Sequence, residues 1–156
     1  MSDWEAVGLI ALAGFLGGIL GFEREIKEKA AGMRTHLLVA ASASAVVVLG
    51  RILNDEAVAD GRIGGDPTRA LHAVVTGIGF IGAGTIMLRK TDREPRGLTT
   101  AASLFFAATV GIAVGVEEVV IAIGMTALAL IALAGLPLLM STIMRDDDHG
   151  AVGDRS

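Results

Sequence analysis

The chain contains no cysteine and comparatively few charged residues. The absence of cysteine among its 156 residues excludes a disulfide, a thiolate metal site and a cysteine nucleophile. Charged side chains make up only 19% of the sequence, whereas soluble domains carry roughly 25%. The net charge of −4 at pH 7 also argues against a nucleic-acid-binding protein, because such proteins present basic surfaces.

Apolar residues dominate the rest of the composition. They account for 53% of the chain, glycine occurs 21 times, and the mean hydropathy is +0.65. A soluble domain of this length could not bury so much apolar surface without leaving large exposed patches. Glycine is also more frequent in transmembrane helices than in soluble ones. The composition therefore indicates an integral membrane protein that lies in a lipid bilayer.

Five apolar stretches are long enough to cross a bilayer, which requires about 20 helical residues. They are residues 6–22, 35–50, 70–88, 97–116 and 119–144. The second extends to Leu53 if the side chain of Arg51 reaches outward to the interface. The last is longer than a bilayer needs, and Pro137 is the expected site of a kink. We therefore predict an all-α protein, a polytopic membrane helix bundle with about five transmembrane helices. Residues 1–145 form the predicted membrane domain, and 146–156 a disordered acidic C-terminal tail.

Lysine and arginine predict how this bundle is oriented. With five spans, the segments 23–34 and 89–96 and the C-terminal tail share one side and carry ten basic residues, against three on the other side. Basic residues accumulate on the cytoplasmic side of membrane proteins. We therefore expect the N-terminus outside and the C-terminus in the cytoplasm, with an acidic external connection between the second and third spans.

Residues 14–35 resemble residues 79–100 when the sequence is shifted by 65 positions. Six positions are identical in the two segments: Gly14/Gly79, Phe15/Phe80, Gly17/Gly82, Arg24/Arg89, Gly32/Gly97 and Thr35/Thr100. Each segment consists of a glycine-containing span, a basic connection and the start of the next span. Since two spans separate the copies, we predict a parallel repeat of two hairpins related by a pseudo-twofold axis along the membrane normal.

Glycines gather in the first and third spans, and their setting predicts helix packing. They are Gly14, Gly17, Gly18 and Gly21 in the first span, and Gly77, Gly79, Gly82 and Gly84 in the third. In lipid, helices associate by close approach at small residues, so we expect these two glycine faces to meet. The spacing Gly77-x-Gly79-x-x-Gly82 also resembles a dinucleotide-binding turn. That turn requires a preceding strand and an acidic residue about 20 positions on, where this chain has Gly97.

Charged residues end the first span at its predicted cytoplasmic side. Glu23, Arg24 and Glu25 form either an interfacial salt-bridge cluster or a group whose carboxylates face a polar cavity between the repeats. In the second case the carboxylates could hold a hard cation such as Mg²⁺ together with water. The spacing of the carboxylates does not require a metal ion.

Threonines stand at the starts of two spans. Thr35 in the second span and Thr100 or Thr99 in the fourth are predicted to cap exposed backbone N–H groups. The alternative is that the two helix N-termini together attract an anion, aided by Arg34 and Arg96.

A second polar group precedes the third span, on the other side of the bundle. Asp66 or Thr68 is the predicted helix cap, and Arg69 is the predicted ion-pair partner of Asp66 at helical spacing. His72 lies one turn further on, and we interpret it as a buried hydrogen-bonding or packing residue.

The combined motifs resemble those of the MgtC/SapB family. They are Gly21-Phe-Glu-Arg-Glu25, Lys29-Ala-Ala-Gly-Met-Arg-Thr-His36, Asp66-Pro-Thr-Arg69, Gly77-Ile-Gly-Phe-Ile-Gly-Ala-Gly-Thr-Ile86 and Gly97-Leu-Thr-Thr-Ala-Ala-Ser103. The resemblance implies a bacterial or archaeal inner-membrane protein with about five spans, linked to growth in low Mg²⁺ and to virulence. It also implies restraint of the ATP synthase by some members, and Mg²⁺ transport as a name given to others. Many members carry a cytoplasmic C-terminal domain, which is not expected in this chain.

Two functional hypotheses follow. The first is a non-enzymatic membrane regulator or adaptor that acts by helix contacts with itself, as a homo-oligomer and most simply a dimer, and with a larger membrane complex such as the ATP synthase. The alternative is a small transporter or binding protein for Mg²⁺ or another ion, with Glu23, Glu25 and Asp66 as candidate metal ligands. No serine, histidine and aspartate set falls on one side of the predicted bundle, so no catalytic residue and no cofactor other than Mg²⁺ is expected.

Overall fold

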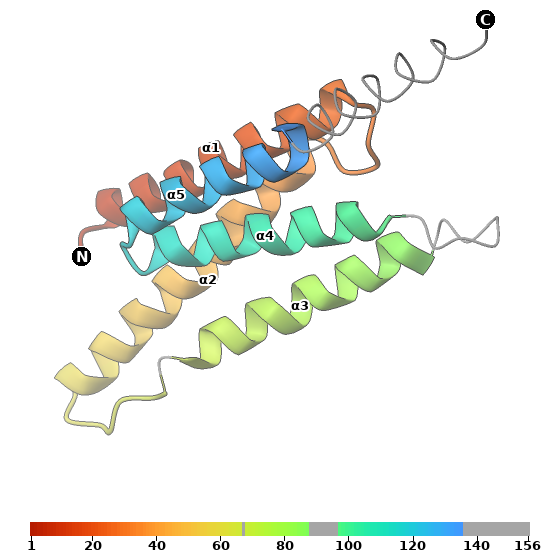
Figure 1. Ribbon diagram of the computed structural model, residues 1–156. Helices are drawn as coiled ribbons and strands as arrows, with labels where there is room; N and C mark the ends of the chain where they lie inside the picture. Colours follow the sequence, from red (N-terminus) through yellow and green to blue (C-terminus); the bar gives the residue numbers. More distant parts are fainter. Residues whose placement is uncertain (67, 88–96, 136–156) are drawn as a thin grey trace, which may run out of the picture.

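The computed structural model describes residues 1–66, 68–87 and 97–135, and the regular elements in these ranges are all helical. The helices are α1 (Asp3–Ile26), α2 (Met33–Ala59), α3 (Thr68–Met87), α4 (Leu98–Gly115) and α5 (Val119–Leu130), and the π-helix η1 (Ile131–Gly135) continues α5 (Figure 1). The all-α prediction is confirmed. The expected kink at Pro137 and the predicted tail 146–156 lie outside the described residues.

Four of these helices are long and apolar enough to cross a membrane. They are α1, α2, residues 68–86 of α3, and α4, while α5 and η1 form a shorter apolar helix over the part that is described. The prediction of a polytopic membrane helix bundle is therefore confirmed. The main difference in bounds concerns α2, which continues nine residues past the predicted end at Gly50, because a single glycine weakens a helix without ending it.

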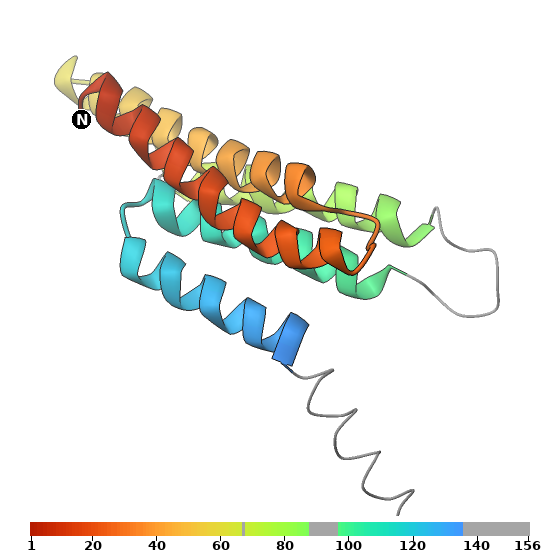
Figure 2. The ribbon, with the colours of Figure 1, turned by 90° about the horizontal axis from the view of Figure 1, so that it is seen from above.

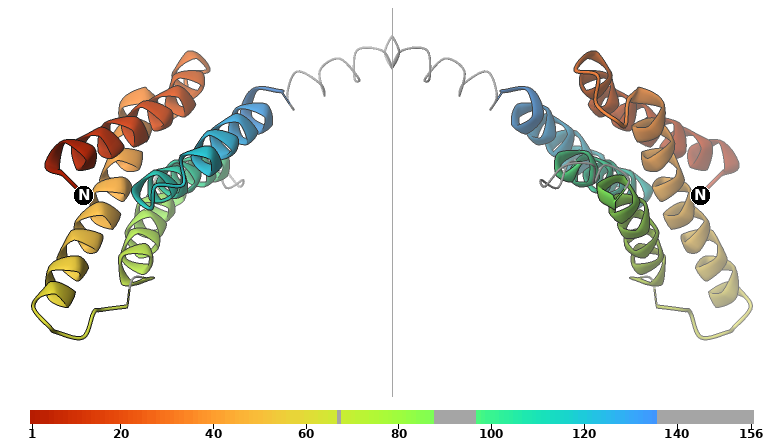
Figure 3. Two further views of the ribbon diagram at one scale, coloured as in Figure 1. Left: turned by 90° about the vertical axis from the view of Figure 1, so that its left-hand side faces the viewer. Right: turned by 90° about the vertical axis from the view of Figure 1, so that its right-hand side faces the viewer.

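Helix α4 occupies the centre of the bundle. It contacts each of α1, α2, α3 and α5, and α1 packs along α2. Figures 1 and 3 show α1 and α3 at opposite edges, with α4 between them. The chain runs back and forth, so the last turn of α1 and the first turns of α2 and α4 lie at one end, called the Arg24 end (Figure 2). The opposite end, where α3 begins, is called the Asp66 end.

Glycines on α1 bring its backbone close to α2. A Cβ atom added to Gly17 would lie 2.5 Å from the carbonyl oxygen of His36, and one added to Gly21 would lie 2.6 Å from the Cα of Met33. Gly14 and Gly18 also face α2, with Leu37 at ordinary van der Waals distance. In membranes, small residues allow this kind of backbone approach.

The expected meeting of the glycine faces of the first and third spans was wrong within one protomer. The glycines of α1 face α2 instead, and α1 and α3 make no extensive contact among the described residues. A second close approach between backbones joins α2 and α4. A Cβ atom added to Gly111 of α4 would overlap the carbonyl oxygen of Ala40 in α2. Spacing of small residues identifies a packing face, but it does not identify the partner helix.

Two contacts recur at the 65-residue offset. The approach of Gly17 to His36 corresponds to that of Gly82 to Ala101, and the approach of Gly21 to Gly32 corresponds to a contact of Ile86 with Gly97. The two hairpins, α1–α2 and α3–α4, are therefore closed at equivalent positions. The internal repeat stays a prediction, and these paired contacts support it.

Candidate functional site

A buried polar network lies at the Arg24 end and joins three helices. Arg24, only 4% exposed, donates from Nη2 to Thr100 Oγ1 over 3.2 Å. The hydroxyl of Ser103 donates to the Thr100 carbonyl oxygen at 2.9 Å and lies 3.1 Å from Nε2 of His36. The other ring nitrogen, Nδ1, is 2.9 Å from the carbonyl oxygen of Gly32. The network therefore connects α1, α4 and α2 through side chains that are almost fully buried.

The pattern of donors and acceptors in this network depends on the protonation state of His36. The Gly32 carbonyl can only accept, so Nδ1 carries a hydrogen. While the Ser103 hydroxyl donates to the Thr100 carbonyl, its oxygen is left as an acceptor for His36 Nε2, which then requires a doubly protonated imidazolium. If the hydroxyl turns toward Nε2 instead, the ring is neutral. The same atoms thus accommodate two protonation states of a fully buried histidine.

Glu23 and Lys27 connect the end of α1 with η1. The ammonium nitrogen of Lys27 is 2.6 Å from Glu23 Oε1 and donates to the carbonyl oxygen of Leu133 at 2.9 Å. The Glu23 carboxylate is largely buried, and neither oxygen has a hydrogen bond of good geometry. Its contact with Lys27 is therefore an ion pair that leaves the hydrogen-bonding capacity of the carboxylate unused.

Glu25 stabilises the start of α2. Its Oε2 accepts from the backbone N–H of Met33 at 2.7 Å, which places a negative charge at a helix N-terminus, where it is favoured. The predicted capping by threonine was wrong. The N-cap residues are Gly32 and Gly97, without side-chain cap bonds, and Thr35 and Thr99 lie exposed inside the first turns.

Asp66 organises the start of α3 at the other end of the bundle. Its Oδ1 accepts from the backbone N–H of Thr68 at 2.9 Å and from the Thr68 hydroxyl at 2.8 Å. No ion pair between Asp66 and Arg69 is found in the described part of the chain. His72 is exposed, so its predicted burial was wrong.

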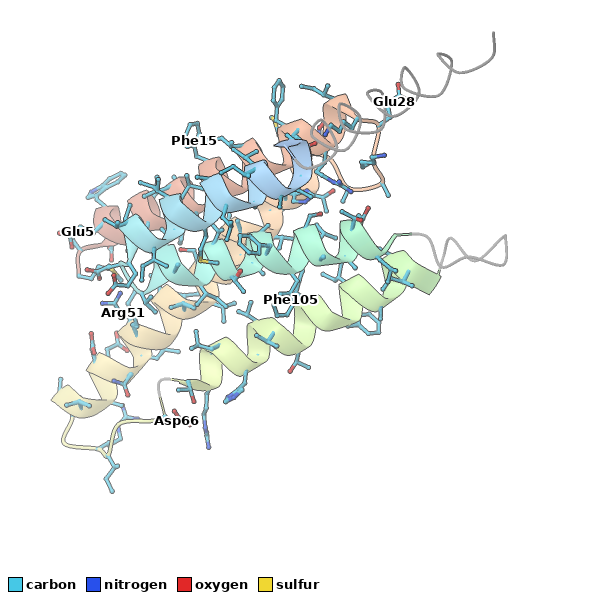
Figure 4. All side chains as sticks on the ribbon, in the orientation of Figure 1. Glu5, Phe15, Glu28, Arg51, Asp66 and Phe105 are labelled. Carbon is cyan, nitrogen blue, oxygen red and sulfur yellow. The ribbon has the colours of Figure 1, made fainter. Side chains whose placement is uncertain are left out.

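The three candidate metal ligands do not converge in one protomer. Asp66 lies at the opposite end of the bundle from Glu28, which follows α1 (Figure 4), and therefore also from Glu23 and Glu25. Glu25 is engaged by the helix start and Glu23 by Lys27. Across the three described ranges, no group of three His, Cys, Asp or Glu residues is close enough to hold a metal ion. Glu23, Glu25 and Asp66 therefore do not form one shared metal site in a protomer.

Sequence reasoning missed the contact between His36 and Ser103 and the partners of Arg51. His36 and Ser103 were not identified as partners, although a polar side chain one turn inside an apolar span is the available signal. Arg51, whose side chain is 40% exposed, donates to the carbonyl oxygen of Gly115 at 2.9 Å and pairs with Glu117 at 2.7 Å. It therefore links α2 to the end of α4.

We expect the stability contributed by Asp66 to disappear on acidification. Hydrogen bonds from the backbone N–H and the hydroxyl of Thr68 lower the pKa of Asp66 below its ordinary value. A depressed folded-state pKa gives a contribution that is complete above the unfolded-state pKa and is lost as the pH falls through the folded-state pKa. Asp66→Ala should therefore lower the thermal unfolding temperature at pH 7, and the difference from wild type should shrink below about pH 4.

The control for this prediction is Asp66→Asn, which keeps an acceptor oxygen but cannot titrate. Its unfolding temperature relative to Asp66→Ala should stay constant between pH 7 and pH 3. A wild-type advantage over Asp66→Ala that persists unchanged at pH 3 would contradict the assignment.

The fold and the buried network define a multi-pass helical membrane protein, and comparison with known proteins identifies its family. The MgtC family model matches residues 10–142, so the chain belongs to the MgtC family. It is 41% identical to "Protein MgtC" of Brucella abortus (strain 2308), and 36% identical to both "Putative magnesium transporter YhiD" of Escherichia coli (strain K12) and "Protein SapB" of Bacillus subtilis (strain 168).

Each of these alignments covers 106 residues, or 68% of this chain. They cover 40% of the Brucella protein, 48% of YhiD and 45% of SapB, so the chain spans less than half the length of these three relatives. No solved structure matches the chain.

Proposed function

We propose that the chain is a non-enzymatic regulator or adaptor of the bacterial or archaeal cytoplasmic membrane that acts through helix contacts, first of all with a second copy of itself. The single observation that carries this proposal is the exposure of α3. Of its span, 11% of the residues are buried in the protomer, compared with 50% for α4. A helix with so few contacts inside its own bundle has most of its surface available to other membrane helices.

The exposed surface of α3 also has the composition of a packing surface. A Cβ atom added to Gly77, Gly79 or Gly84 would meet nothing within 4 Å, and one on Gly82 meets only Ala101, at 3.6 Å. Lipid gains nothing from an exposed glycine, whereas a neighbouring helix can approach it closely. These glycines are therefore available to a helix from outside the protomer.

A groove beside α3 adds shape to this surface. It has a volume of about 340 Å³ and lies between α2 and α3 over α4, with a lining that is almost entirely apolar. Val39 and Ala43 contribute from α2, Ile78 and Ile81 from α3, and Ala108 from α4. We assign α3 and this groove to a symmetric dimer, in which α3 of each copy lies against the other copy.

The decisive test replaces the exposed glycines of α3 with a bulky residue. Gly77→Leu with Gly79→Leu should leave the protomer folded, because nothing lies within 4 Å of either position, but should weaken dimerisation at least about tenfold by separating the helices. Dimer content would be measured by native mass spectrometry in lipid nanodiscs. In a bacterial host without its own family member, the same variant should fail to support growth in low Mg²⁺.

The matched control is Gly8→Leu with Gly124→Leu, two equally open positions on α1 and α5. This variant should dimerise and support growth as wild type does. If the α3 variant dimerises as strongly as the control variant, α3 is not the dimer interface. If it loses the dimer but still supports growth, the self-contact is not the functional one. A larger complex such as the ATP synthase then becomes the partner to test by co-purification.

The alternative, a Mg²⁺ transporter or ion-binding protein, rests on the name of the relative YhiD and on the buried, incompletely hydrogen-bonded carboxylate of Glu23. Mg²⁺ uptake by proteoliposomes that disappears in Glu23→Ala with Glu25→Ala would favour it over the regulator. Absence of uptake under a Mg²⁺ gradient by folded, reconstituted protein would remove it.

A further inference from the structure

Arg24 is a buried positive charge whose hydrogen-bonding capacity is largely unused. Its guanidinium carries five N–H donors, and the described partner is the neutral hydroxyl of Thr100. Nε is buried and has no partner. Among the described residues no carboxylate lies within ion-pair distance of Arg24. Removing a charge from water without a counter-charge is costly, so the site favours a negatively charged occupant.

The carboxylates on the same turn of α1 do not bond to Arg24, although Glu23 is near enough to interact with it electrostatically. Glu23 is paired with Lys27, and Glu25 accepts from the N–H of Met33 at the start of α2. Both negative charges are therefore engaged by other groups, while Arg24 extends toward α4.

The start of α4 adds further donors beside Arg24. The first intrahelical bond of α4 runs from the N–H of Ala101 to the carbonyl of Gly97, so the N–H groups of residues 98–100 have no acceptor within the helix. Gly97 provides no capping side chain. Leu98 and Thr99, the first two residues of α4, are exposed. Free N–H groups and the helix dipole together favour an anion.

We propose that Arg24 and the N-terminus of α4 form a binding site for a phosphate-type oxyanion at the Arg24 end. The planar guanidinium can donate two parallel hydrogen bonds to such a group, and the α4 N–H groups can bind its remaining oxygens. Both a lipid headgroup and free phosphate supply this chemistry. The site is separate from the α3 surface, so it holds whether or not the proposed dimer forms.

The test measures inorganic phosphate binding to the full chain, purified in a neutral detergent, by isothermal titration calorimetry at constant ionic strength with chloride as the replaced anion. Wild type should bind phosphate saturably. Arg24→Gln should weaken the affinity by about tenfold or more, the loss expected for a hydrogen bond between charged groups. The control Arg62→Gln, an exposed arginine at the Asp66 end, should bind as wild type. Equal phosphate affinity in Arg24→Gln and wild type would overturn the proposal.

Two further arms keep the result decisive. If Arg24→Gln does not yield folded protein, Thr100→Val replaces it, because this variant removes the hydroxyl that orients the guanidinium. It should also bind phosphate more weakly, and unchanged affinity would overturn the site. The second arm uses nanodiscs of phosphatidylcholine with and without phosphatidylglycerol. If phosphate binds in phosphatidylcholine alone but not after phosphatidylglycerol is added, the occupant is the lipid phosphate. If phosphate binds in both lipid compositions, the occupant is the soluble ion. Absence of saturable phosphate binding in detergent and in both lipid compositions overturns the proposal.

Discussion

Replacing Gly17 with alanine is expected to destabilise the helix bundle strongly. The added methyl group would lie 2.5 Å from the carbonyl oxygen of His36 and 2.6 Å from the Cβ of Ala40. These neighbours belong to the first turns of α2, so the whole of α2 must move to accommodate it. Overpacking of this kind costs on the order of 3 kcal/mol, which is a large part of a typical folding free energy of 5–15 kcal/mol. Thermal unfolding in detergent and the yield of monodisperse protein would measure the loss.

The control is Gly124→Ala, a helical glycine of α5 with nothing within 4 Å. It should be neutral, or stabilise by up to about 1 kcal/mol, because alanine has the higher helix propensity. Gly111→Ala, whose methyl group would overlap the carbonyl oxygen of Ala40, should behave like Gly17→Ala. Stability of Gly17→Ala equal to that of Gly124→Ala would show that α1 and α2 are further apart than described.

The second large effect is expected for Gly97→Ala, which should open the hairpin of α3 and α4. Gly97 adopts the left-handed conformation, with φ of 96°, and a non-glycine residue there costs roughly 1–2 kcal/mol. In addition, the methyl group would lie 2.7 Å from the carbonyl oxygen of Thr85 in α3. The two costs add because one is local to the backbone of residue 97 and the other is a contact between helices.

Gly61→Ala separates these two costs. Gly61 is also left-handed, with φ of 73°, but nothing lies within 4 Å of an added Cβ. It should therefore show the conformational cost alone, and Gly97→Ala should exceed it by about 1–3 kcal/mol of overpacking. Equal unfolding free energies for the two variants would mean that α3 does not pack closely against the start of α4.

The helices were predictable because the length of an apolar run indicates the length of the helix and shows that lipid surrounds it. The identity of packing partners was not. The spacing of Gly17 and Gly21 specifies a smooth helix face, but whether α2 or α3 covers that face depends on contacts distant in sequence. The same applies to the cap of α2, where Thr35 was the local candidate. Glu25 takes this role because the turn after α1 returns its carboxylate to the N–H of Met33.

The polar site was predictable in position but not in partners. The location of Glu23, Arg24 and Thr100 at span ends identifies them as candidates. Arg24 and Thr100 are 76 positions apart in the sequence, however, so the hydrogen bond between them could not be predicted. Nothing in the sequence around His36 indicates its hydrogen-bond partner. Its role depends on Ser103, which the packing of α2 against α4 brings to it.

Helix α2 has 27 residues, which corresponds to about 40 Å, while a hydrocarbon core measures about 30 Å. The bond from Arg51 to Gly115 aligns α2 with the last turn of α4. The eight residues that follow Arg51 therefore extend roughly 12 Å beyond that level, and they carry Asp55 and Glu56. A thicker bilayer can cover these turns only if the carboxylates of Asp55 and Glu56 enter the hydrocarbon core, whereas a thinner bilayer leaves them in water. The protein thus has an upper limit on the membrane thickness that it tolerates, set by the length of a single helix.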